Sequence, residues 1–270
     1  MRKFLDPVVA EAAANELLRQ HAQRLQFTGL TGAGAPTTAG AAYQIQDVFV
    51  AQSLRQRQTT LCGYKIALTT VAMREMVGFH DSVSGRLFND QMLRSGHTLQ
   101  ARDYVHLIVE FEIAFELARD LPVRATPWTG ASILECVACA YPALEIADDR
   151  AADYANLNES VLTLVADNAW NQGLVLGPAV TKFDVASLLA LAGIAFIDDR
   201  EVGRGTGRDV MGHPLEALAW LANHLQGRDM VMKAGDIVTT GSLVRSQFPV
   251  AGTRIAFRLA NFGEVTLNVD

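Results

Sequence analysis

The chain has 270 residues, of which 50% are hydrophobic and 19% are charged, and its formal net charge is -6. This length allows one large domain or two unequal ones with a sizeable core. The acidic balance argues against nucleic acid or an anionic membrane as a partner. It does not exclude small acidic substrates, because a bound metal can reverse the charge locally.

Targeting and redox signals are weak throughout the sequence. The three cysteines, Cys62, Cys136 and Cys139, are sparse and odd in number, which favours a reducing cytoplasm over a disulfide scaffold. Residues 1–7 lack the long apolar region of a signal peptide. The longest apolar run, residues 188–197, is interrupted by a glycine and is too short to span a bilayer. We therefore expect a cytoplasmic protein that does not associate with membranes.

The N-terminal quarter reads as helical. Apolar residues recur at helical spacing over residues 7–27, and Asp6 and Pro7 provide a cap and a first turn. A Gly/Ala/Thr/Pro loop follows over residues 29–40, and a second helix is expected over residues 41–56.

A strand with a lysine among apolar residues and a polar loop come next. Residues 61–70 form an apolar strand with Lys65 in its middle, where a lysine needs an anionic partner unless it reaches the surface. A short helix is expected over residues 70–77, followed by a loop over residues 78–85. In that loop, His80 and Asp81 could handle protons, although a plain polar loop is the simpler interpretation.

Residues 105–115 carry the clearest chemical signal. Strict alternation predicts a β-strand that places Glu110 and Glu112 on one face, opposite a face that is entirely apolar. Two such carboxylates repel by roughly 3–4 kcal/mol at an effective dielectric near 20, so the pair needs a cation, a basic partner or a proton. A hard divalent cation would meet that need. An edge strand with two solvated glutamates is the alternative.

The following segment offers a third carboxylate. A short helix is expected over residues 131–140, with Cys136 and Cys139 as small buried residues on one helical face rather than a redox or zinc pair. Residues 141–150 then form a strand with Glu145 in apolar company. Glu145 could pair with Arg150 or another basic group, or it could complete a metal site.

The C-terminal part is rich in strands. Residues 162–168 are strand-like or a buried approach to a turn, residues 173–177 form a strand, and helices are expected over residues 184–191 and 214–225. The remaining elements are a strand entering a turn at residues 198–200, a turn, strand and second turn over residues 233–242, and a hairpin of strands 253–259 and 264–269. Segregated helices and strands predict an α+β fold.

With these pieces in order, the chain resembles the hydratase/decarboxylase branch of the fumarylacetoacetate hydrolase superfamily over nearly its whole length. The resemblance depends on several short motifs in a fixed order and spacing. They are Ala42-Tyr43-Gln44-Ile45-Gln46, residues 63–69, residues 109–115, Pro142-Ala143-Leu144-Glu145-Ile146, Asp167-Asn168-Ala169, Gly212-His213-Pro214-Leu215 with residues 217–223, and Gly235-Asp236-Ile237-Val238 with Gly241-Ser242.

The resemblance implies a helical N-terminal segment over residues 1–78, which includes the Lys65 strand, and a catalytic mixed β-roll over residues 79–270. It also implies one Mg²⁺ or Mn²⁺ bound by three carboxylates. These correspond here to Glu110, Glu112 and Glu145.

The implied activity is a metal-dependent lyase reaction on a small 2-keto or 2-hydroxydienoate acid. The first expectation is hydration of 2-hydroxypenta-2,4-dienoate to 4-hydroxy-2-oxopentanoate in aromatic catabolism, and the second is decarboxylation of the 4-oxalocrotonate type. Lys65 and Ser242 correspond to pocket residues. The family also implies a homo-oligomer that can associate with a sister hydratase or decarboxylase, so a non-catalytic partner protein is a further alternative.

One position departs from the family pattern. Where an acidic residue is expected two places before a glycine, this chain has Val83-Ser84-Gly85. If that acid moves protons during hydration, its replacement favours decarboxylation, unless His80 or Asp81 takes its place.

Overall fold

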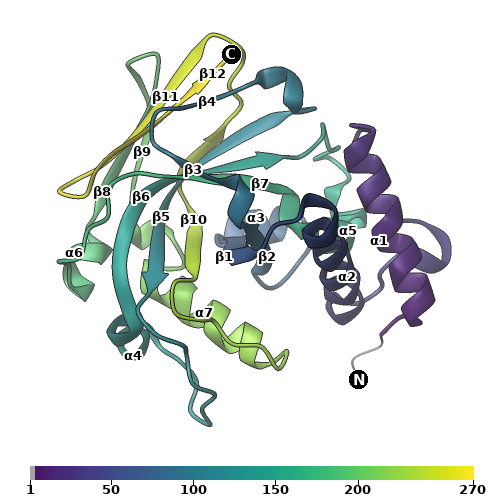
Figure 1. The fold of residues 1–270 in the computed structure, drawn as a ribbon. Helices are drawn as coiled ribbons and strands as arrows, with labels where there is room; N and C mark the ends of the chain where they lie inside the picture. The colour runs from purple at the N-terminus through teal and green to yellow at the C-terminus, as the bar shows by residue number, and fades with distance from the viewer. Residues whose placement is uncertain (1–3) are drawn as a thin grey trace.

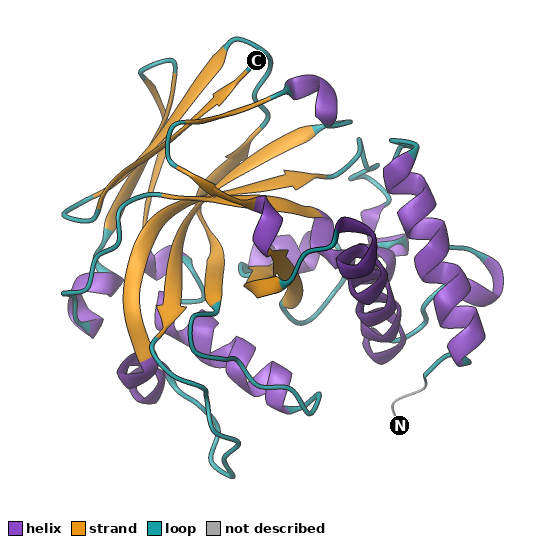
Figure 2. Ribbon diagram, in the orientation of Figure 1, coloured by secondary structure: helices purple, strands orange, loops and turns teal. Residues whose placement is uncertain are grey.

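The computed structural model describes residues 4–270, so residues 1–3 of the N-terminal stretch considered above lie outside the described residues. Within residues 4–270 the strands form two sheets, with helices at their margins (Figure 1, Figure 2). The larger sheet has the strand order β2-β1-β10-β5-β6-β7-β3, and the smaller has the order β4-β12-β11-β8-β9. The predicted α+β class is therefore confirmed.

The elements have the following bounds. The larger sheet contains β1 (Leu61–Ala67), β2 (Val83–Phe88), β3 (Met92–Arg94), β5 (Leu107–Leu117), β6 (Val137–Asp148), β7 (Asn171–Leu176) and β10 (Ile237–Gln247). The smaller contains β4 (His97–Leu99), β8 (Ala192–Ile197), β9 (Arg200–Thr206), β11 (Thr253–Leu259) and β12 (Gly263–Val269). The helices are α1 (Pro7–Ala22), α2 (Ala39–Arg57), α3 (Val71–Met76), α4 (Gly130–Ile133), α5 (Val161–Ala166), α6 (Val185–Leu189) and α7 (Pro214–Gln226).

The larger sheet is strongly curled, so that one of its faces is concave (Figure 2). The curl brings β2 next to the turn that precedes β7. There the Asn168 side chain accepts a hydrogen bond from the Arg86 N–H at 2.6 Å and donates one to the Arg86 carbonyl at 2.9 Å. The amide of Asn168 thus takes the place of a strand partner for β2.

The period-two pattern of β5 separates a core face from a functional face. Val109, Phe111 and Ile113 are all fully buried and belong to the main core, which also contains Phe257 of β11 and Leu267 of β12. This packing of the two sheets against each other accounts for the apolar face predicted for residues 105–115. The glutamates therefore lie on the opposite, concave face.

Helices α1 and α2 pack side by side near β2, an edge strand of the larger sheet (Figure 1). Asp6 accepts a hydrogen bond from the Val8 N–H and Pro7 occupies the first turn of α1, as the sequence predicts. Both helices contribute to a second buried cluster, with Leu17 and Ile45 fully buried. The division of the chain at residue 78 stays a prediction, while β1, on its N-terminal side, pairs in parallel with β10.

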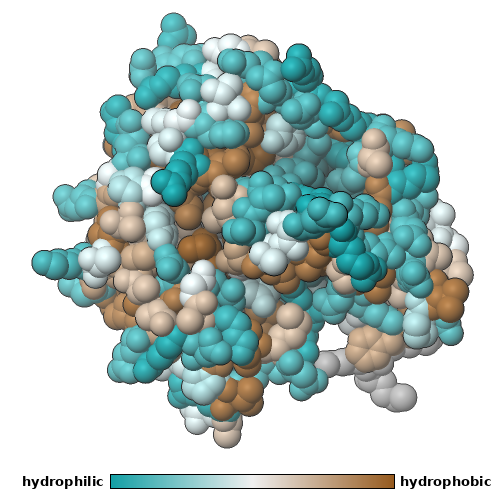
Figure 3. All heavy atoms as spheres, viewed as in Figure 1, coloured by the Kyte–Doolittle hydropathy of each residue, from teal (hydrophilic) through white to brown (hydrophobic). Residues whose placement is uncertain are grey.

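The surface in Figure 3 has hydrophilic side chains over most of its rim and hydrophobic ones toward its middle. Among residues 4–270, no helix combines the length and apolarity needed to cross a bilayer.

Two expected elements have the wrong secondary structure. The helix expected over residues 131–140 ends early, because Val137–Asp148 is strand β6, paired along β5. The strand-like alternative for residues 162–168 is wrong as well, since α5 covers Val161–Ala166 and packs against α2. In both places tertiary contacts override the local pattern.

Two expected boundaries also move. Residues 83–85, expected within a loop, begin strand β2. The second turn expected at residues 241–242 is a bulged stretch of β10, which continues to Gln247. Gly241 makes the bulge possible, because its φ is +103° and a Cβ there would lie 2.4 Å from the Thr69 hydroxyl oxygen.

The cysteines are free thiols. Cys136 and Cys139 are buried as expected, but not on one helical face, because Cys136 ends a 3₁₀ turn and Cys139 lies in β6. Burial and the neighbouring Glu116 raise the pKa of the Cys139 thiol, although its hydrogen bond with Tyr141 partly offsets the effect.

A buried ion network joins α1 to the turns that follow β6 and α5. The Asp167 carboxylate, 1% exposed, lies 2.5 Å from His21 Nε2 and 2.8 Å from Arg150 Nη1. Burial alone would raise the pKa of Asp167, but the charges and hydrogen bonds of His21 and Arg150 outweigh it and lower this pKa. The network therefore stabilises the fold only while Asp167 is ionised.

We expect Asp167→Asn to lower the free energy of unfolding at pH 7 by about 3–5 kcal/mol, since it leaves Arg150 buried without a counter-ion. In the wild type this contribution is complete above about pH 4, the pKa of an unfolded aspartate, and is lost as the pH falls through the lower folded-state pKa. Urea unfolding at several pH values measures both effects. The exposed Asp153→Asn is the control, and equal stability of the two variants at pH 7 would contradict the prediction.

Candidate metal centre

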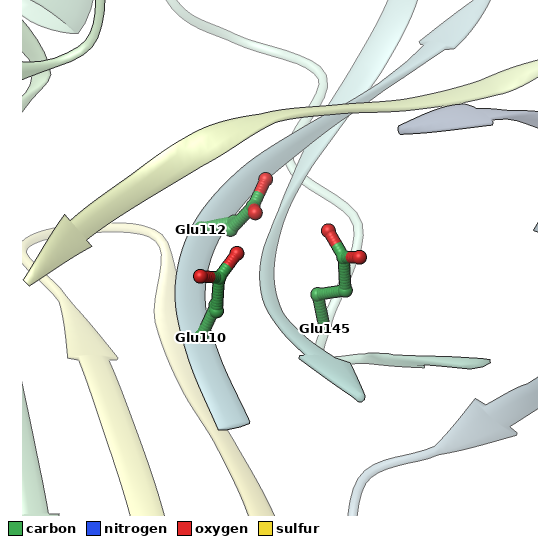
Figure 4. A group of neighbouring side chains, drawn as sticks. All are labelled: Glu110, Glu112 and Glu145. Carbon is green, nitrogen blue, oxygen red and sulfur yellow. The ribbon is translucent and has the colours of Figure 1, made fainter. Parts of the chain in front are cut away.

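Three carboxylates from two adjacent strands converge on the concave face of the larger sheet (Figure 4). Strand pairing places Glu110 of β5 directly opposite Glu145 of β6, and Glu112 lies two residues further along β5 on the same face. One oxygen from each of the three lies within 4.8 Å of the others. Side-chain alternation along β5 places Glu110 and Glu112 on this face, and the register of β5 with β6 places Glu145 beside them.

Burial makes it costly in free energy for all three carboxylates of this cluster to be ionised together. Glu112 and Glu145 are fully buried, and Lys65 of β1 is 3% exposed, with its Nζ 3.0 Å from Glu145 Oε1. Burial and the charges of Glu145 and Glu110 hold the pKa of Glu112 well above its ordinary value. Burial likewise raises the pKa of Glu145, although Lys65 partly offsets the effect.

Lys65 is a basic partner of the kind that the paired glutamates of β5 need. Burial alone would lower the pKa of Lys65, but the charges of Glu145, Glu110 and Glu112 together raise it, so the ammonium form is retained. Three ionised carboxylates and one ammonium carry a net charge of two negative units. A bound divalent cation would neutralise this charge.

Two of the carboxylates have one oxygen held by a protein donor. Ser246 Oγ donates to Glu110 Oε1 at 2.8 Å, and the Gly241 N–H donates to Glu112 Oε2 at 2.7 Å. The other oxygen of Glu112, Oε1, is buried and has no hydrogen-bond partner among the described residues. A buried carboxylate oxygen in that state is costly, and a cation is the partner that fits its chemistry.

Glu145 is the most restrained of the three. Its Oε1 accepts hydrogen bonds from Lys65 and, at 3.1 Å, from the Asn171 side chain, and its Oε2 lies 3.4 Å from the Thr239 hydroxyl. Donors of this kind orient metal-binding carboxylates in proteins. The residues present therefore fit a hard divalent cation held by oxygen atoms.

Ser242 lies in β10, and its hydroxyl is engaged with the backbone. Its Oγ accepts a hydrogen bond from the Phe111 N–H at 2.8 Å and donates to the Val244 carbonyl at 2.6 Å. These contacts hold the β10 bulge against β5. A contact of Ser242 with substrate stays a prediction.

His80 and Asp81 are both exposed. Asp81 Oδ1 accepts hydrogen bonds from Trp220 Nε1 at 3.0 Å and from the Ser82 N–H at 2.8 Å. Val83, which replaces the expected acid, is fully buried in the N-terminal cluster. The proton-handling role of His80 and Asp81 is thus still a prediction, and their present contacts are those of a surface loop.

The sequence interpretation did not identify Ser246, Asn171 or Thr239. Asn171 directly follows three residues, Asn168, Ala169 and Trp170, whose φ angles are 52°, 49° and 61°. Left-handed backbone at non-glycine residues costs on the order of 1–3 kcal/mol each and persists where surrounding contacts demand it. The Asp167-Asn168-Ala169 motif marked this turn, but only its folded shape directs Asn171 to Glu145.

We expect Ser246→Ala to weaken divalent-metal binding by about 10- to 100-fold, because Glu110 loses the donor that orients it. Isothermal titration of the metal-free protein with Mg²⁺ measures the effect. Ser187→Ala, at the exposed start of α6, is the matched control. An unchanged dissociation constant in Ser246→Ala would show that Glu110 needs no such support.

The part of the chain that contains the three glutamates also matches known proteins. The family model described as fumarylacetoacetate (FAA) hydrolase C-terminal matches residues 80–270. The chain is 31% identical over 256 residues to 2-keto-4-pentenoate hydratase 1 of Dechloromonas aromatica (strain RCB), which covers 95% of each chain. It is 28% identical over 255 residues to 4-oxalocrotonate decarboxylase of Pseudomonas sp, which covers 92% of this chain and 96% of that one.

Among solved structures, 4-oxalocrotonate decarboxylase from Pseudomonas putida G7 complexed with magnesium and adipate has a TM-score of 0.90 to this chain. The two are 22% identical, and the match covers 99% of this chain and 100% of that one. This likeness establishes the shared fold.

Fold and site together define an α+β protein with a buried carboxylate cluster on a curled sheet. The chain belongs to the fumarylacetoacetate hydrolase family, as the resemblance implied. Its relatives are named as hydratases and decarboxylases, both of which are lyases, and this is the predicted enzyme class.

Proposed function

We propose that this protein is a divalent-metal-dependent lyase that acts on small 2-keto or 2-hydroxydienoate acids, and that it hydrates 2-hydroxypenta-2,4-dienoate to 4-hydroxy-2-oxopentanoate in aromatic catabolism. The observation that carries the proposal is the buried Glu112 Oε1, which lacks a partner among the described residues and lies in a cluster of three carboxylates and one lysine. The hydratase named above, 31% identical over 95% of this chain, supports hydration as the first reaction to test.

The proposed ligands of the cation are Glu110, Glu112 and Glu145, and the proposed cation is Mg²⁺ or Mn²⁺. Hard oxygen ligands favour these ions, and magnesium is present in the solved decarboxylase structure. When bound, the cation supplies a Lewis acid that stabilises negative charge developing on the 2-oxygen of the substrate.

Lys65 has a separate role in the proposal. Its ammonium group is held within the site by Glu145 and is shielded from solvent, so its charge is little screened. It would meet the substrate carboxylate or the enolate oxyanion that forms when water adds to the conjugated enone. The buried surroundings of Lys65 and Glu112 exclude water from one side of the site.

Decarboxylation of the 4-oxalocrotonate type is the second candidate. The favouring observations are the close fold likeness to the decarboxylase structure and the buried Val83 in place of an acid. The same charge stabilisation would act on the substrate oxygen that takes up the electron pair of the broken C–C bond as carbon dioxide leaves. A non-catalytic partner of such an enzyme is the remaining alternative.

We further propose a homo-oligomer in the cytoplasm, able to associate with a sister hydratase or decarboxylase, with a small 2-keto acid as ligand. Family membership supports the oligomer, and the sparse free cysteines support the reducing compartment. Sedimentation of the purified protein, alone and mixed with a sister enzyme, tests the assembly.

Ultraviolet assay of 2-hydroxypenta-2,4-dienoate turnover with Mg²⁺ or Mn²⁺, against a sample treated with EDTA, tests the proposed function. Metal-dependent formation of 4-hydroxy-2-oxopentanoate, identified by NMR, is the expected result. If metal binds but this substrate is not consumed, turnover of 4-oxalocrotonate would establish the decarboxylase instead. No metal-dependent reaction of either acid would leave the non-catalytic partner as the surviving hypothesis.

A further inference from the structure

A histidine lies just before β5, the strand that carries Glu110 and Glu112. It is His106, in a bend four residues before Glu110. Strand β10 and its extension contact both residues. Ser246 donates to Glu110, and two residues later Phe248 stacks on the His106 ring, with centroids 4.8 Å apart and planes 12° apart.

His106 is oriented by a buried carboxylate. Its side chain is 42% exposed, and its Nδ1 lies 2.7 Å from Oδ1 of Asp149, which is fully buried. The same Asp149 oxygen accepts the Ala151 N–H at 2.8 Å, and the other oxygen accepts the Tyr154 hydroxyl at 2.8 Å. Asp149 therefore has three donors around it when ionised.

This arrangement fixes the tautomer of His106. An ionised carboxylate only accepts hydrogen bonds, so a neutral His106 must carry its proton on Nδ1 to bond Asp149. The basic lone pair is then on Nε2, on the half-exposed side of the ring. A half-exposed histidine held from behind by a buried aspartate has the geometry of a general base.

The pair formed by His106 and Asp149 also lies near the carboxylate cluster. Burial, the hydrogen bond to Asp149 and the charges of Asp149 and Glu110 raise the pKa of Tyr154, so the field of Glu110 reaches the residue that supports Asp149. Along β5, four residues span roughly 13 Å between the Cα atoms of His106 and Glu110.

We propose that His106, oriented by Asp149, is the proton-transfer residue for the far end of the substrate. The inference rests on the proposed function and extends it to the step for which the chain lacks the expected acid at Val83. In that step a water oxygen bonds to C4 of the conjugated enone and loses one proton to His106 Nε2. The C3–C4 π pair moves to form the enolate, which then recovers the proton at C3 and becomes the 2-oxo product.

The ionisable groups that face His106 are few among the described residues. Asp148 accepts the backbone N–H of His106 at 2.8 Å, Asp149 accepts Nδ1–H, and Tyr154 lies behind Asp149. Because His106 must be neutral to accept a proton from water, we expect kcat to fall at acidic pH.

The first test compares His106→Gln with the wild type on the dienoate. General acid–base catalysis contributes about 10²- to 10⁴-fold, so we expect kcat to fall by at least about 100-fold while the Mg²⁺ dissociation constant changes less than about twofold. The variant should also lose the acidic limb of the kcat–pH profile. His97→Gln, at an exposed position of β4 in the smaller sheet, is the matched control.

The second test does not depend on turnover. Nitrogen-15 NMR of histidine-labelled wild-type protein should show neutral His106 protonated on Nδ1. Asp149→Asn should shift the proton toward Nε2, because an amide can donate to Nδ1, and should lower kcat by about 10²- to 10⁴-fold through the wrong tautomer.

Each outcome bears on the proposal. Wild-type kcat and an unchanged pH profile in His106→Gln would overturn it while the proposed function stands. A proton on Nε2 in the wild type would also overturn it, even if His106→Gln failed to fold. If the wild type showed no metal-dependent turnover of the dienoate, both the proposed hydration and this inference would fail.

Discussion

Replacing Glu112 with glutamine is expected to abolish divalent-metal binding and to reduce turnover by at least about 10³-fold. A bound cation stabilises transition-state charge by several kcal/mol, and about 4 kcal/mol corresponds to that factor. Glu112 is fully buried, and its Oε1 has no hydrogen-bond partner among residues 4–270, so the substitution removes the charge from the carboxylate whose oxygen is free to bind a cation.

The same substitution should stabilise the metal-free protein. Burial and the nearby charges of Glu145 and Glu110 raise the pKa of Glu112, so the metal-free fold is strained by the ionised form as the pH rises. The sign follows from linkage: an acid with a raised folded-state pKa favours the fold at low pH and loses that contribution as the pH rises through this pKa. A glutamine has no charge to bury, so the metal-free variant should melt above the metal-free wild type at pH 8.

Glu116→Gln is the matched control for Glu112→Gln. Glu116 lies on the same face of the same strand, four residues on, but it is half-buried and accepts a hydrogen bond from the Tyr141 hydroxyl. We expect this variant to bind Mg²⁺ like the wild type. Isothermal titration and calorimetric melting, with and without EDTA, make the comparison. Wild-type metal affinity in Glu112→Gln would refute its role as a ligand.

Replacing Lys65 with methionine is expected to separate catalysis from metal binding. Methionine keeps much of the side-chain volume but removes the ammonium group. Turnover should fall by about 10²- to 10³-fold, because the developing oxyanion or substrate carboxylate loses the positive charge of the ammonium group. Metal affinity should stay the same or rise, since the site loses a positive charge that competes for Glu145.

The metal-free form of Lys65→Met should also be unstable. The three carboxylates would then lack a buried counter-ion, and breaking a buried pair in this way costs about 3–5 kcal/mol. Adding Mg²⁺ should restore most of that loss. Thermal melting with and without Mg²⁺, beside kcat and the metal dissociation constant, tests both effects. A variant that lost metal binding and turnover together would show that Lys65 serves the cation site as a whole.

Much of the site follows from local sequence pattern. The alternation over residues 105–115 places Glu110 and Glu112 on one face, because successive side chains of a strand point to opposite sides. The same reasoning placed Lys65 within an apolar strand, either beside an anionic partner or reaching the surface, and the structure has it beside Glu145, 3% exposed. The amphipathic helix predicted over residues 214–225 is likewise present as α7. These features depend on periodicities that neighbouring residues alone determine.

Other features required the tertiary structure. Glu145 meets Glu110 only through the register of β5 with β6, and residues 137–140 become strand only because β5 is available to pair with them. The N–H of Gly241 reaches Glu112 because β10 bulges there, and Asn171 reaches Glu145 after a left-handed turn. His106 and Asp149 are 43 residues apart in sequence.

The sequence alone determined the kinds of side chain in the site, the faces on which they lie and the family to which the chain belongs. The tertiary structure decided which carboxylate oxygens contact protein donors, that Glu112 Oε1 has no hydrogen-bond partner among residues 4–270, and which histidines have a buried carboxylate partner. The physical reason is that hydrogen bonds and charge interactions act over a few ångströms, whereas the residues that make them are separated by tens to more than a hundred positions along the chain.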